Sequence, residues 1–380
     1  MKLGVTPKEK CDLQPGPFFQ QTVFWGRLKE LHGCEVLAFD LWLTADCDLR
    51  EDKANCCFSV HDDFLIVLRP VGSNYLMAYI PYGPSLEPPE ELQGSILEEL
   101  SENLRRYLPD NCLFIRYDLP WQSPWAREKD NNGHGGRWRG APRPEIQELR
   151  MNFSTARNRL RKAQTNILPS NTVFLDLDST QEQILRQMKS KTRYNIRLSL
   201  RKGVRIIDAG PSYLDTWYRL YQETARRNSI ALHDYQYFQT IFAARAGNAN
   251  RHTTVCLLLA VADGLPLAGM FLGLCDRQAV YLYGASSSRK RNKMASYALQ
   301  WEAICRAKRH GCRYYDMFGV SPSPDPSHPM FGLYRFKTGF GGSLFHRQGC
   351  WDYPLRRKDY TLYRTQELND QGYHLRKASP

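Results

Sequence analysis

The stretch with the clearest chemical potential is Lys189–Arg205, which reads KSKTRYNIRLSLRKGVR. Seven of its seventeen residues are basic and none is acidic. The spacing of Arg193, Arg197 and Arg201 by four places them on one face of a helix, which Gly203 ends. Arginine forks bind phosphate oxygens in pairs of hydrogen bonds, so this face is a candidate anion site. The alternative is an ordinary solvated helix with basic residues near its C-terminus.

A second basic run lies between an expected strand end and an expected helix N-terminus. It consists of Arg289, Lys290, Arg291 and Lys293. Free backbone N–H groups and the positive end of the helix dipole favour an anion there. No glycine occurs between Arg289 and Lys308, so the backbone is not suited to close contact with a pyrophosphate. Contact with an RNA backbone needs only charge and reach, and it is expected instead.

Aromatic residues and glycines surround one lysine, Lys337, in the segment Phe331–Gly342. A lysine held in an apolar cleft can stabilise a developing oxyanion, as acyl transfer requires. The alternative is a twisted strand with a lysine whose charged end reaches solvent. The sequence contains no Gly-x-Ser-x-Gly and no His-Glu-x-x-His motif, so neither a serine hydrolase nor a zinc protease is indicated.

The composition is that of a folded protein with excess positive charge. Of the 380 residues, 42% are hydrophobic and 24% charged, which excludes disorder, collagen and coiled coil for the whole chain. The net charge of +13 indicates nucleic acid, anionic lipid or phosphorylated small molecules as partners. The longest apolar run, Val255–Ala262, is far shorter than the about 20 residues of a membrane-spanning helix.

The cysteines and the first residues bear on location. Eleven cysteines are scattered and never spaced as Cys-x-x-Cys, and the His and Cys pairs of a zinc site are missing. We therefore expect reduced thiols and no metal. The first residues, MKLGVTPKEK, precede no apolar run, so no secretory signal is expected. The expected location is the cytoplasm.

The periodicity of apolar residues predicts two similar halves. In the first, a helix over 89–107 lies between strands at 75–80 and 112–117. In the second, a helix over 294–308 lies between strands at 279–283 and 313–317. Asp263-Gly264 is the turn of a preceding hairpin. Other predicted elements are strands at 35–43, 64–69, 172–177, 204–207, 253–262, 267–275, 343–347 and 350–353, helices at 154–164 and from 358, and a long loop at 120–144.

The two halves align on matching residues. Tyr82-Gly83-Pro84 begins a stretch that reaches Cys112, and Tyr283-Gly284-Ala285 begins one that reaches Cys312. The separations from tyrosine to cysteine are 30 and 29 residues, which favours an internal duplication over two unrelated meanders. Antiparallel strands followed by a helix and another strand make an α+β unit, whose order resembles the acyl-CoA N-acyltransferase (GNAT) fold.

Motifs of the second half together resemble the FemABX family of tRNA-dependent aminoacyltransferases, which are non-ribosomal peptidyltransferases. They are Lys191–Arg197 with Arg201–Val204, Tyr315-Asp316 before Gly319-Val320, and Gly332–Gly342 with its Phe336-Lys337 pair. Weaker matches in the first half are Phe19-Gln20-Gln21 with Trp25 and Lys29, and Tyr79–Pro84. The resemblance covers most of the chain.

The resemblance implies two tandem GNAT-like α+β domains with a cleft between them, at 1–165 (completed by about 345–380) and at 166–344. It implies transfer of an amino acid from aminoacyl-tRNA to the side-chain amine of the peptidoglycan stem peptide, which forms the interpeptide bridge of the cell wall. The acceptor would be UDP-muramyl pentapeptide or its lipid-linked form. Aminoacyl-tRNA is a co-substrate, and no cofactor or metal is implied. Peripheral contact with the inner face of the plasma membrane would suit the net charge.

The resemblance also assigns roles to individual residues. Lys337, with Phe336, would face the acceptor end of the tRNA and stabilise the tetrahedral intermediate. Glu87, the nearest carboxylate after Gly83-Pro84, could position the attacking amine.

Other residues would bind the acceptor. Its phosphates would be held by Lys29 and by Arg193 or Arg197, and its peptide groove would be lined by Tyr79, Tyr82 and Tyr194.

Two further functions stay open. The first is a GNAT-type N-acyltransferase that uses acyl-CoA or another activated donor, although the missing glycine loop counts against it. The second is a protein that only binds RNA or a membrane surface. Such a protein would have no need of Lys337 in its setting of aromatic residues and glycines.

Overall fold

The computed structural model describes residues 2–45, 58–127, 138, 140–246 and 253–367. Contacts within the chain divide it into two units. The first comprises the described parts of 1–14, 33–168 and 347–370, and the second those of 15–32 and 169–346. Residues 15–32 group with the second unit, whereas the sequence-based boundaries put them in the first. Each unit is an α+β structure.

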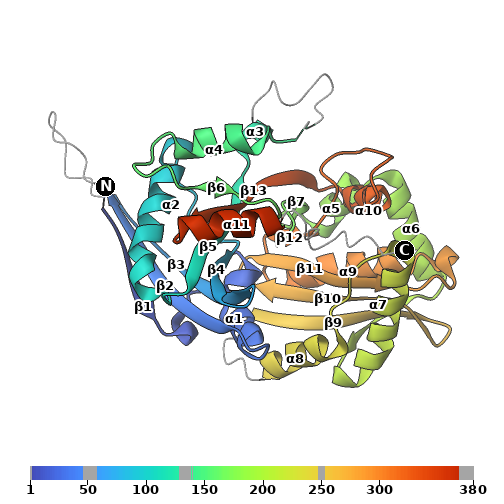
Figure 1. Cartoon of the computed structure of the whole chain (residues 1–380). Helices are drawn as coiled ribbons and strands as arrows, with labels where there is room; N and C mark the ends of the chain where they lie inside the picture. The colour runs from blue at the N-terminus through green and yellow to red at the C-terminus, as the bar shows by residue number, and fades with distance from the viewer. Residues whose placement is uncertain (1, 46–57, 128–137, 139, 247–252, 368–380) are drawn as a thin grey trace. The chain divides into compact units, whose positions relative to one another are not determined.

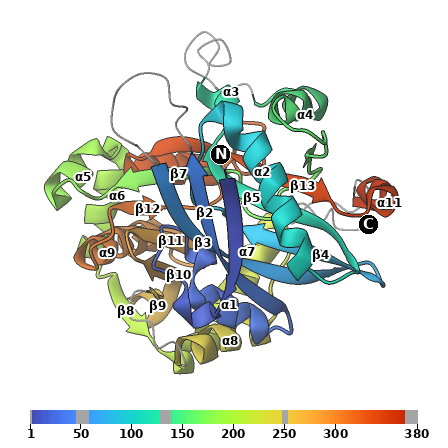
Figure 2. The same ribbon diagram turned by 90° about the vertical axis from the view of Figure 1, so that its left-hand side faces the viewer.

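The first unit is a sheet in the order β1-β2-β3-β4-β5-β13, in which only β4 and β5 run parallel. Helix α2 (Glu90–Leu104) connects these two strands, and it packs across the sheet through Ile96, Leu97, Leu100 and Leu104 (Figures 1 and 2). The strands are β1 (Lys2–Lys8), β2 (Glu35–Ala45), β3 (Phe58–Val71), β4 (Tyr75–Pro81), β5 (Cys112–Gln122) and β13 (Ser343–Pro354), with β6 (Arg161–Lys162) paired to β13. These four side chains form the buried face of the helix, whereas Leu92, expected on the same face, is 39% exposed.

The second unit repeats this plan. Its sheet has the order β13-β7-β12-β11-β10-β9-β8, and only β11 and β12 run parallel. Helix α9 (Ala295–Arg309) connects them, as α2 connects β4 and β5. The strands are β7 (Asn171–Asp176), β8 (Arg205–Ala209), β9 (Thr253–Ala262), β10 (Leu265–Cys275), β11 (Gln278–Ser286) and β12 (Tyr314–Asp316). Strand β13 serves both units, because residues 343–346 pair with β7 and residues 347–354 with β5.

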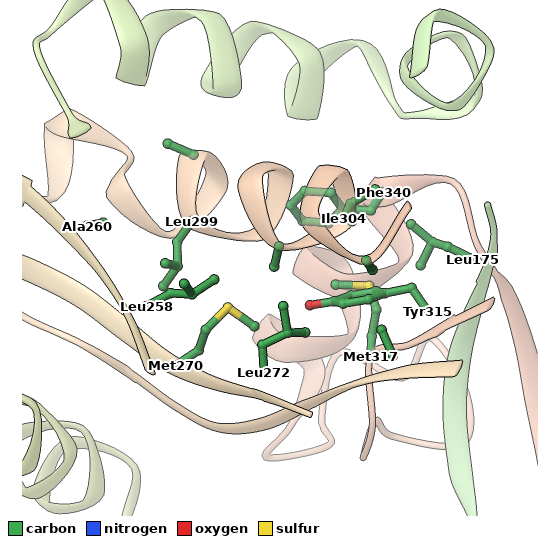
Figure 3. Close-up of a cluster of buried hydrophobic side chains, with 14 of the residues drawn as sticks. Leu175, Leu258, Ala260, Met270, Leu272, Leu299, Ile304, Tyr315, Met317 and Phe340 are labelled. Carbon is green, nitrogen blue, oxygen red and sulfur yellow. The ribbon is translucent and has the colours of Figure 1, made fainter. Parts of the chain in front are cut away.

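Helices cover both faces of the second sheet. One core joins Leu258, Met270 and Leu272 of the sheet to Leu299 and Ile304 of α9 (Figure 3). On the other face, Trp217 and Phe238 pack on Phe271 of β10. The remaining helices are α1 (Val23–Glu30), α5 (Gln181–Gln187), α6 (Ser190–Arg201), α7 (Leu214–Asn228), α8 (Tyr235–Ala246) and α10 (Phe331–Lys337) in the second unit, and α3 (Pro124–Arg127), α4 (Pro144–Asn152) and α11 (Arg357–Glu367) in the first.

Two sequence-based predictions are wrong. The helix expected at 154–164 is instead α4, which ends at Asn152. Pro144 occupies the first turn of α4 and favours a start there. After α4, the Asn152 side chain accepts from Leu160 N (3.0 Å) and donates to Leu160 O (2.8 Å), which closes 152–160 into a loop. The twisted strand considered around Lys337 is helix α10 followed by a 3₁₀ turn.

Other differences concern where elements end. The two strands expected at 343–353 form the single strand β13. The loop expected from residue 120 begins later, because β5 continues to Gln122 and α3 follows it. Much of that loop lies outside the described residues. The hairpin turn at Asp263-Gly264 is present, and both residues have positive φ (51° and 71°), as its two-residue length requires.

Candidate active site

Lys337 is the last residue of α10, and its side chain points into the second unit with 4% of the residue exposed. Its Nζ atom donates to the carbonyl oxygens of Phe318 (3.0 Å) and Gly319 (2.6 Å), and it lies 5.2 Å from the centre of the Tyr281 ring. Burial lowers the pKa of Lys337 to about 7, against the opposing effect of the Asp316 charge. An ammonium group has three N–H donors, and the two carbonyls accept from two of them.

The turn that presents these carbonyls is built by Asp316, at the end of β12. The Asp316 carboxylate accepts from Phe318 N (2.7 Å) and from the hydroxyl of Thr172 on β7. Phe318 has a φ of 60°, a left-handed conformation that is uncommon outside glycine. The carboxylate thus holds a strained turn whose oxygens face the lysine, which is the kind of local strain found at functional sites.

Phe336, also on α10, packs against the core around α9. Its ring is half-buried and packs edge-on against Tyr297 of α9 (5.1 Å between centroids) and Phe340 (5.2 Å). These contacts join α10 to the core around α9. Aromatic packing of this kind fixes the end of the helix from which Lys337 projects.

The two basic segments predicted separately are neighbours in the structure. Lys202, at the C-terminal end of α6, donates from Nζ to Asn292 O (2.9 Å), and Lys293 Nζ donates to Lys202 O (3.0 Å). The loop turns tightly without glycine, because Lys290 and Met294 both adopt left-handed φ values (47° and 55°). This places the end of α6 beside the loop that precedes α9.

We call the exposed arginines of these segments the basic patch: Arg197 and Arg201 of α6, and Arg289 and Arg291 of the loop. Within the part of the chain that the structure describes, none of the four has an ion-pair partner. The neighbouring lysines differ, since hydrogen bonds from Lys290 and Lys293 (2.7 Å each) lower the pKa of Asp263 to about 2. The patch therefore keeps a net positive charge that is open to a partner.

The remaining predicted residues of α6 have different surroundings. Arg193 donates to the carbonyl oxygens of Arg186 (3.1 Å) and Met188, so it caps the end of α5 and does not join the patch. Tyr194 is 55% exposed on the outer surface of α6. It lies three residues before Arg197 and seven before Arg201, so the three share a helix face.

Lys29, on α1, lies within an aromatic cluster of the second unit. Its Nζ is 4.5 Å from the Trp25 ring centre and 5.5 Å from that of Tyr237. The Tyr237 ring is stacked between the imidazoles of His32 (4.7 Å) and His233 (4.2 Å). Rings on several sides thus orient the ammonium of Lys29 by cation–π attraction.

Two predicted residues of the first unit, Tyr79 and Tyr82, are more buried than expected for a groove. Tyr79 is 5% exposed, and its hydroxyl donates to Asp118 Oδ2 (3.0 Å). Tyr82 is 2% exposed and lies beneath the guanidinium of Arg347 (4.4 Å). Glu87 is at the surface, in an ion pair with Arg127 of α3 (2.6 Å). Burial raises the pKa of Asp118.

Sequence reasoning assigned no role to Asp316 or Asp118. Each follows a tyrosine at the corresponding place in the two halves, in β12 and in β5, and each is almost completely buried. The repeated Tyr-Asp pair was the signal that could have found them. Over the described residues, no group of three His, Cys, Asp or Glu side chains is placed to hold a metal ion. No described helix is both long and apolar enough to cross a membrane.

Comparison with known proteins matches the chain to one family model and to several relatives. The model of the FemAB family matches residues 18–250 and 258–367. The lipid II:glycine glycyltransferase of Staphylococcus haemolyticus is 23% identical over 256 residues, 52% of this chain and 61% of that protein. The Staphylococcus aureus protein of the same name is 22% identical over 258 residues, with the same shares. The alignments thus span less than two thirds of these relatives' length.

A solved structure supports the fold across both units. The crystal structure of FemX superposes with a TM-score of 0.69 at 17% sequence identity. The superposition covers 93% of this chain and 96% of FemX. At this identity the likeness establishes the fold.

Proposed function

Because this chain belongs to the FemAB family, we propose that it is an aminoacyltransferase that extends the peptidoglycan stem peptide. The donor is an aminoacyl-tRNA, and the acceptor is the side-chain amine of the stem peptide on a lipid-linked or UDP-linked precursor. The reaction takes place in the cytoplasm, at or near the inner face of the plasma membrane. The buried Lys337, held by two carbonyls, is the structural observation that carries the proposal.

For this reaction the protein needs mainly to position the amine and the ester and to stabilise the negative charge that develops on the carbonyl oxygen. The acceptor amine attacks the ester carbonyl of the donor, forming a C–N bond and a tetrahedral oxyanion. The C–O bond to the tRNA ribose then breaks, and the proton from the amine leaves with the ribose oxygen. The third N–H of Lys337 donates to the oxyanion, where charge develops in the transition state. No nucleophilic side chain is needed, because the ester is already activated.

The basic patch is the proposed contact for the tRNA backbone. Arg197, Arg201, Arg289 and Arg291 have no acidic partner among the described residues, and guanidinium groups pair well with phosphates. Lys202, at the end of the helix that carries Arg197, contacts the loop, so we assign Arg197 to tRNA and leave Lys29 as the proposed contact for the acceptor diphosphate. The exposed Tyr194 on the same face offers a surface on which a base can stack.

The surroundings of the loop disfavour an acyl-CoA donor. The loop between β11 and α9 carries Arg289, Lys290, Arg291 and Lys293, where a pyrophosphate-binding loop would have glycines. Lys290 and Met294 adopt left-handed backbone conformations that glycine usually occupies. Side chains therefore stand where a pyrophosphate-binding loop would leave the backbone open. A donor that presents its phosphates to long arginine side chains fits this surface better.

The test is a donor competition. The purified chain is incubated with lipid-linked precursor, or with UDP-muramyl pentapeptide, and offered either a charged tRNA pool or acyl-CoA. Transfer from the tRNA pool that RNase abolishes supports the proposal and identifies the amino acid. Transfer only from acyl-CoA, or none with either acceptor, contradicts it. The same assay is run with Lys337→Met, which should lose transfer. Lys308→Met is the matched control, because Lys308 also donates to a carbonyl oxygen (Leu177 O, 2.8 Å).

A further inference from the structure

The first unit contains a small pocket beside the N-terminal end of α2. Its floor includes the buried side chains of Ser123, Gln348 and Trp351, and its rim includes the half-buried Trp125 of α3. A water molecule needs about 10–15 Å³ of such space, so the pocket volume of about 30 Å³ gives room for one small group. A whole sugar ring or amino-acid side chain does not fit inside it.

Trp351, on β13, brings an unpaired donor to this pocket. The residue is 3% exposed, and its Nε1 atom is buried without a hydrogen-bond partner in the described part of the chain. An indole nitrogen donates and does not accept. A buried donor without an acceptor is unfavourable, and such a group in a native structure requires an explanation. An acceptor oxygen on a molecule in the pocket would satisfy it.

A row of side-chain amides leaves an unpaired acceptor in the same pocket. Pro88 O can only accept, and Gln93 Nε2 donates to it (3.3 Å). Gln93 Oε1 then accepts from Gln348 Nε2 (2.7 Å). This order fixes the orientation of the Gln348 amide and leaves its Oε1 atom without a partner among the described residues. The hydroxyl of Ser123 likewise has no partner there.

The charged groups around the pocket already have partners. Arg150 and Glu90, both at the rim, form an ion pair. Lys162 Nζ lies 5.5 Å from the centre of the Trp351 ring, and it donates to two backbone carbonyls of β13 (2.8 and 2.9 Å). The unpaired atoms that remain are neutral, one donor and two groups that can accept. They complement the C=O and N–H of a single uncharged amide.

We propose that this pocket binds a terminal uncharged amide, which is either a carboxamide or the acetamido group of an N-acetylated sugar. The amide oxygen accepts from Trp351 Nε1, its N–H donates to Gln348 Oε1, and the Ser123 hydroxyl supplies a further hydrogen bond. The remainder of the ligand lies outside, at the rim beside Trp125. This site is separate from the lysine and the basic patch of the second unit, and it does not depend on the proposed function.

Nuclear magnetic resonance of the indole N–H groups tests this proposal. The full chain is labelled with ¹⁵N at tryptophan and titrated with acetamide, and the Trp351 signal is assigned with Trp351→Phe. A new hydrogen bond should move that signal downfield and saturate it with a Kd in the range of about 1–100 mM, as expected for four heavy atoms. The Trp121 signal is the internal control, because its Nε1 is also buried and unpaired but lies outside the pocket.

Analogues of acetamide test each contact without changing the protein. Methyl acetate keeps the carbonyl and lacks the N–H, so it should bind about tenfold more weakly because Gln348 Oε1 stays unpaired. Acetate carries a charge that no group in the pocket neutralises, and it should not move the Trp351 signal. N-acetylglucosamine and propanamide then distinguish the two sources of the amide, since the one that saturates the signal at lower concentration identifies the natural group.

Substitutions provide a second line of evidence. Gln348→Met removes the free acceptor and should weaken acetamide binding by about tenfold, and Ser123→Ala by about threefold. Gln181→Met, at an exposed glutamine of α5, is the matched control and should leave the affinity unchanged. Because Gln348→Met also removes a partner of Gln93, the comparison of acetamide with methyl acetate on the wild type decides the case if this variant does not fold.

Four results would overturn the inference. The first is an unmoved Trp351 signal at saturating acetamide, which would show that the pocket holds water alone. The others are equal binding of acetamide and methyl acetate, preference for acetate, and equal movement of the Trp121 signal. No aminoacyl transfer enters this experiment, so its failure leaves the proposed function intact, and failure of the proposed function leaves the amide site to be judged by these signals.

Discussion

Replacing Lys337 by Met should slow turnover by about 100- to 1,000-fold without destabilising the fold. Methionine has a similar length and no charge, so it fills the same space. Burial lowers the pKa of Lys337 from 10.5 to about 7, which corresponds to a cost of about 5 kcal/mol for holding the protonated lysine in the folded protein at pH 7. Against this, the carbonyl oxygens of Phe318 and Gly319 lose their donor, at about 1–3 kcal/mol each. The variant should therefore be about as stable as the wild type at pH 7, or more stable.

The pH dependence of the unfolding free energy distinguishes an effect of the buried amine from a change in packing alone. The unfolded chain holds a proton on Lys337 up to pH 10.5, whereas the folded chain releases it near pH 7. Between these values the unfolded state binds more protons, so the wild type gains stability as pH rises. Denaturant unfolding should show the wild type gaining about 4 kcal/mol relative to Lys337→Met between pH 7 and pH 10. A difference that does not change with pH would refute the buried position of the amine.

The activity of the same variant tests the chemical role. Loss of one oxyanion donor costs about 100- to 1,000-fold in kcat. We expect this loss in single-turnover transfer from aminoacyl-tRNA, with the Kd for tRNA unchanged, because the basic patch is intact. Since the ammonium form is the donor, the wild-type rate should fall as pH rises through about 7. Full activity of Lys337→Met, or a loss confined to tRNA affinity, would refute the role.

Three further predictions concern other sites. Arg116→Met leaves two buried carboxylate partners unpaired and should cost about 3–5 kcal/mol in denaturant unfolding, whereas an unchanged midpoint would contradict the buried network. Arg201→Glu with Arg291→Glu should weaken binding of uncharged tRNA and reduce its salt slope by about 2, with Arg106→Glu as an exposed control in the first unit; equal slopes would remove the patch from tRNA binding. His346 has its pKa lowered to about 4 by burial, so the folded protein binds fewer protons than the unfolded chain between pH 4 and 6.5. The wild type should lose about 3 kcal/mol more than His346→Gln as pH falls across that range, and parallel unfolding curves would show an accessible imidazole.

Local patterns of sequence were enough to predict most of the architecture. The apolar spacing in α2 and the Asp263-Gly264 turn depend on periodicity and backbone preference, which act over short distances. The duplication was visible because matching residues recur at matching separations. The helix expected at 154–164 failed for a reason that no local pattern carries. The bonds from Asn152 to Leu160 form a loop only after both ends are in place.

In the candidate site, too, local sequence patterns identified the residues, whereas tertiary contacts determine their surroundings. Lys337 was found from its unusual neighbours in the sequence, but its burial depends on the Phe318 and Gly319 carbonyls, 19 and 18 residues earlier. The basic residues of α6 and of the loop could each be recognised as anion sites. The two segments become neighbours through hydrogen bonds between Lys202 and loop residues about 90 positions later in the sequence. Composition identifies charge, and only tertiary structure shows which charges are already neutralised.

The position of the added amino acid on the acceptor decides whether the chain is an aminoacyltransferase of the stem peptide. Lipid-linked precursor is incubated with charged tRNA and the chain, and the stem peptide is sequenced by tandem mass spectrometry. A matched precursor has its side-chain amine acetylated. We expect a mass gain of one amino acid on the side-chain amine, absent with the acetylated precursor and after RNase. A gain that survives acetylation or RNase, or no gain with either the lipid-linked or the UDP-linked acceptor, would contradict it.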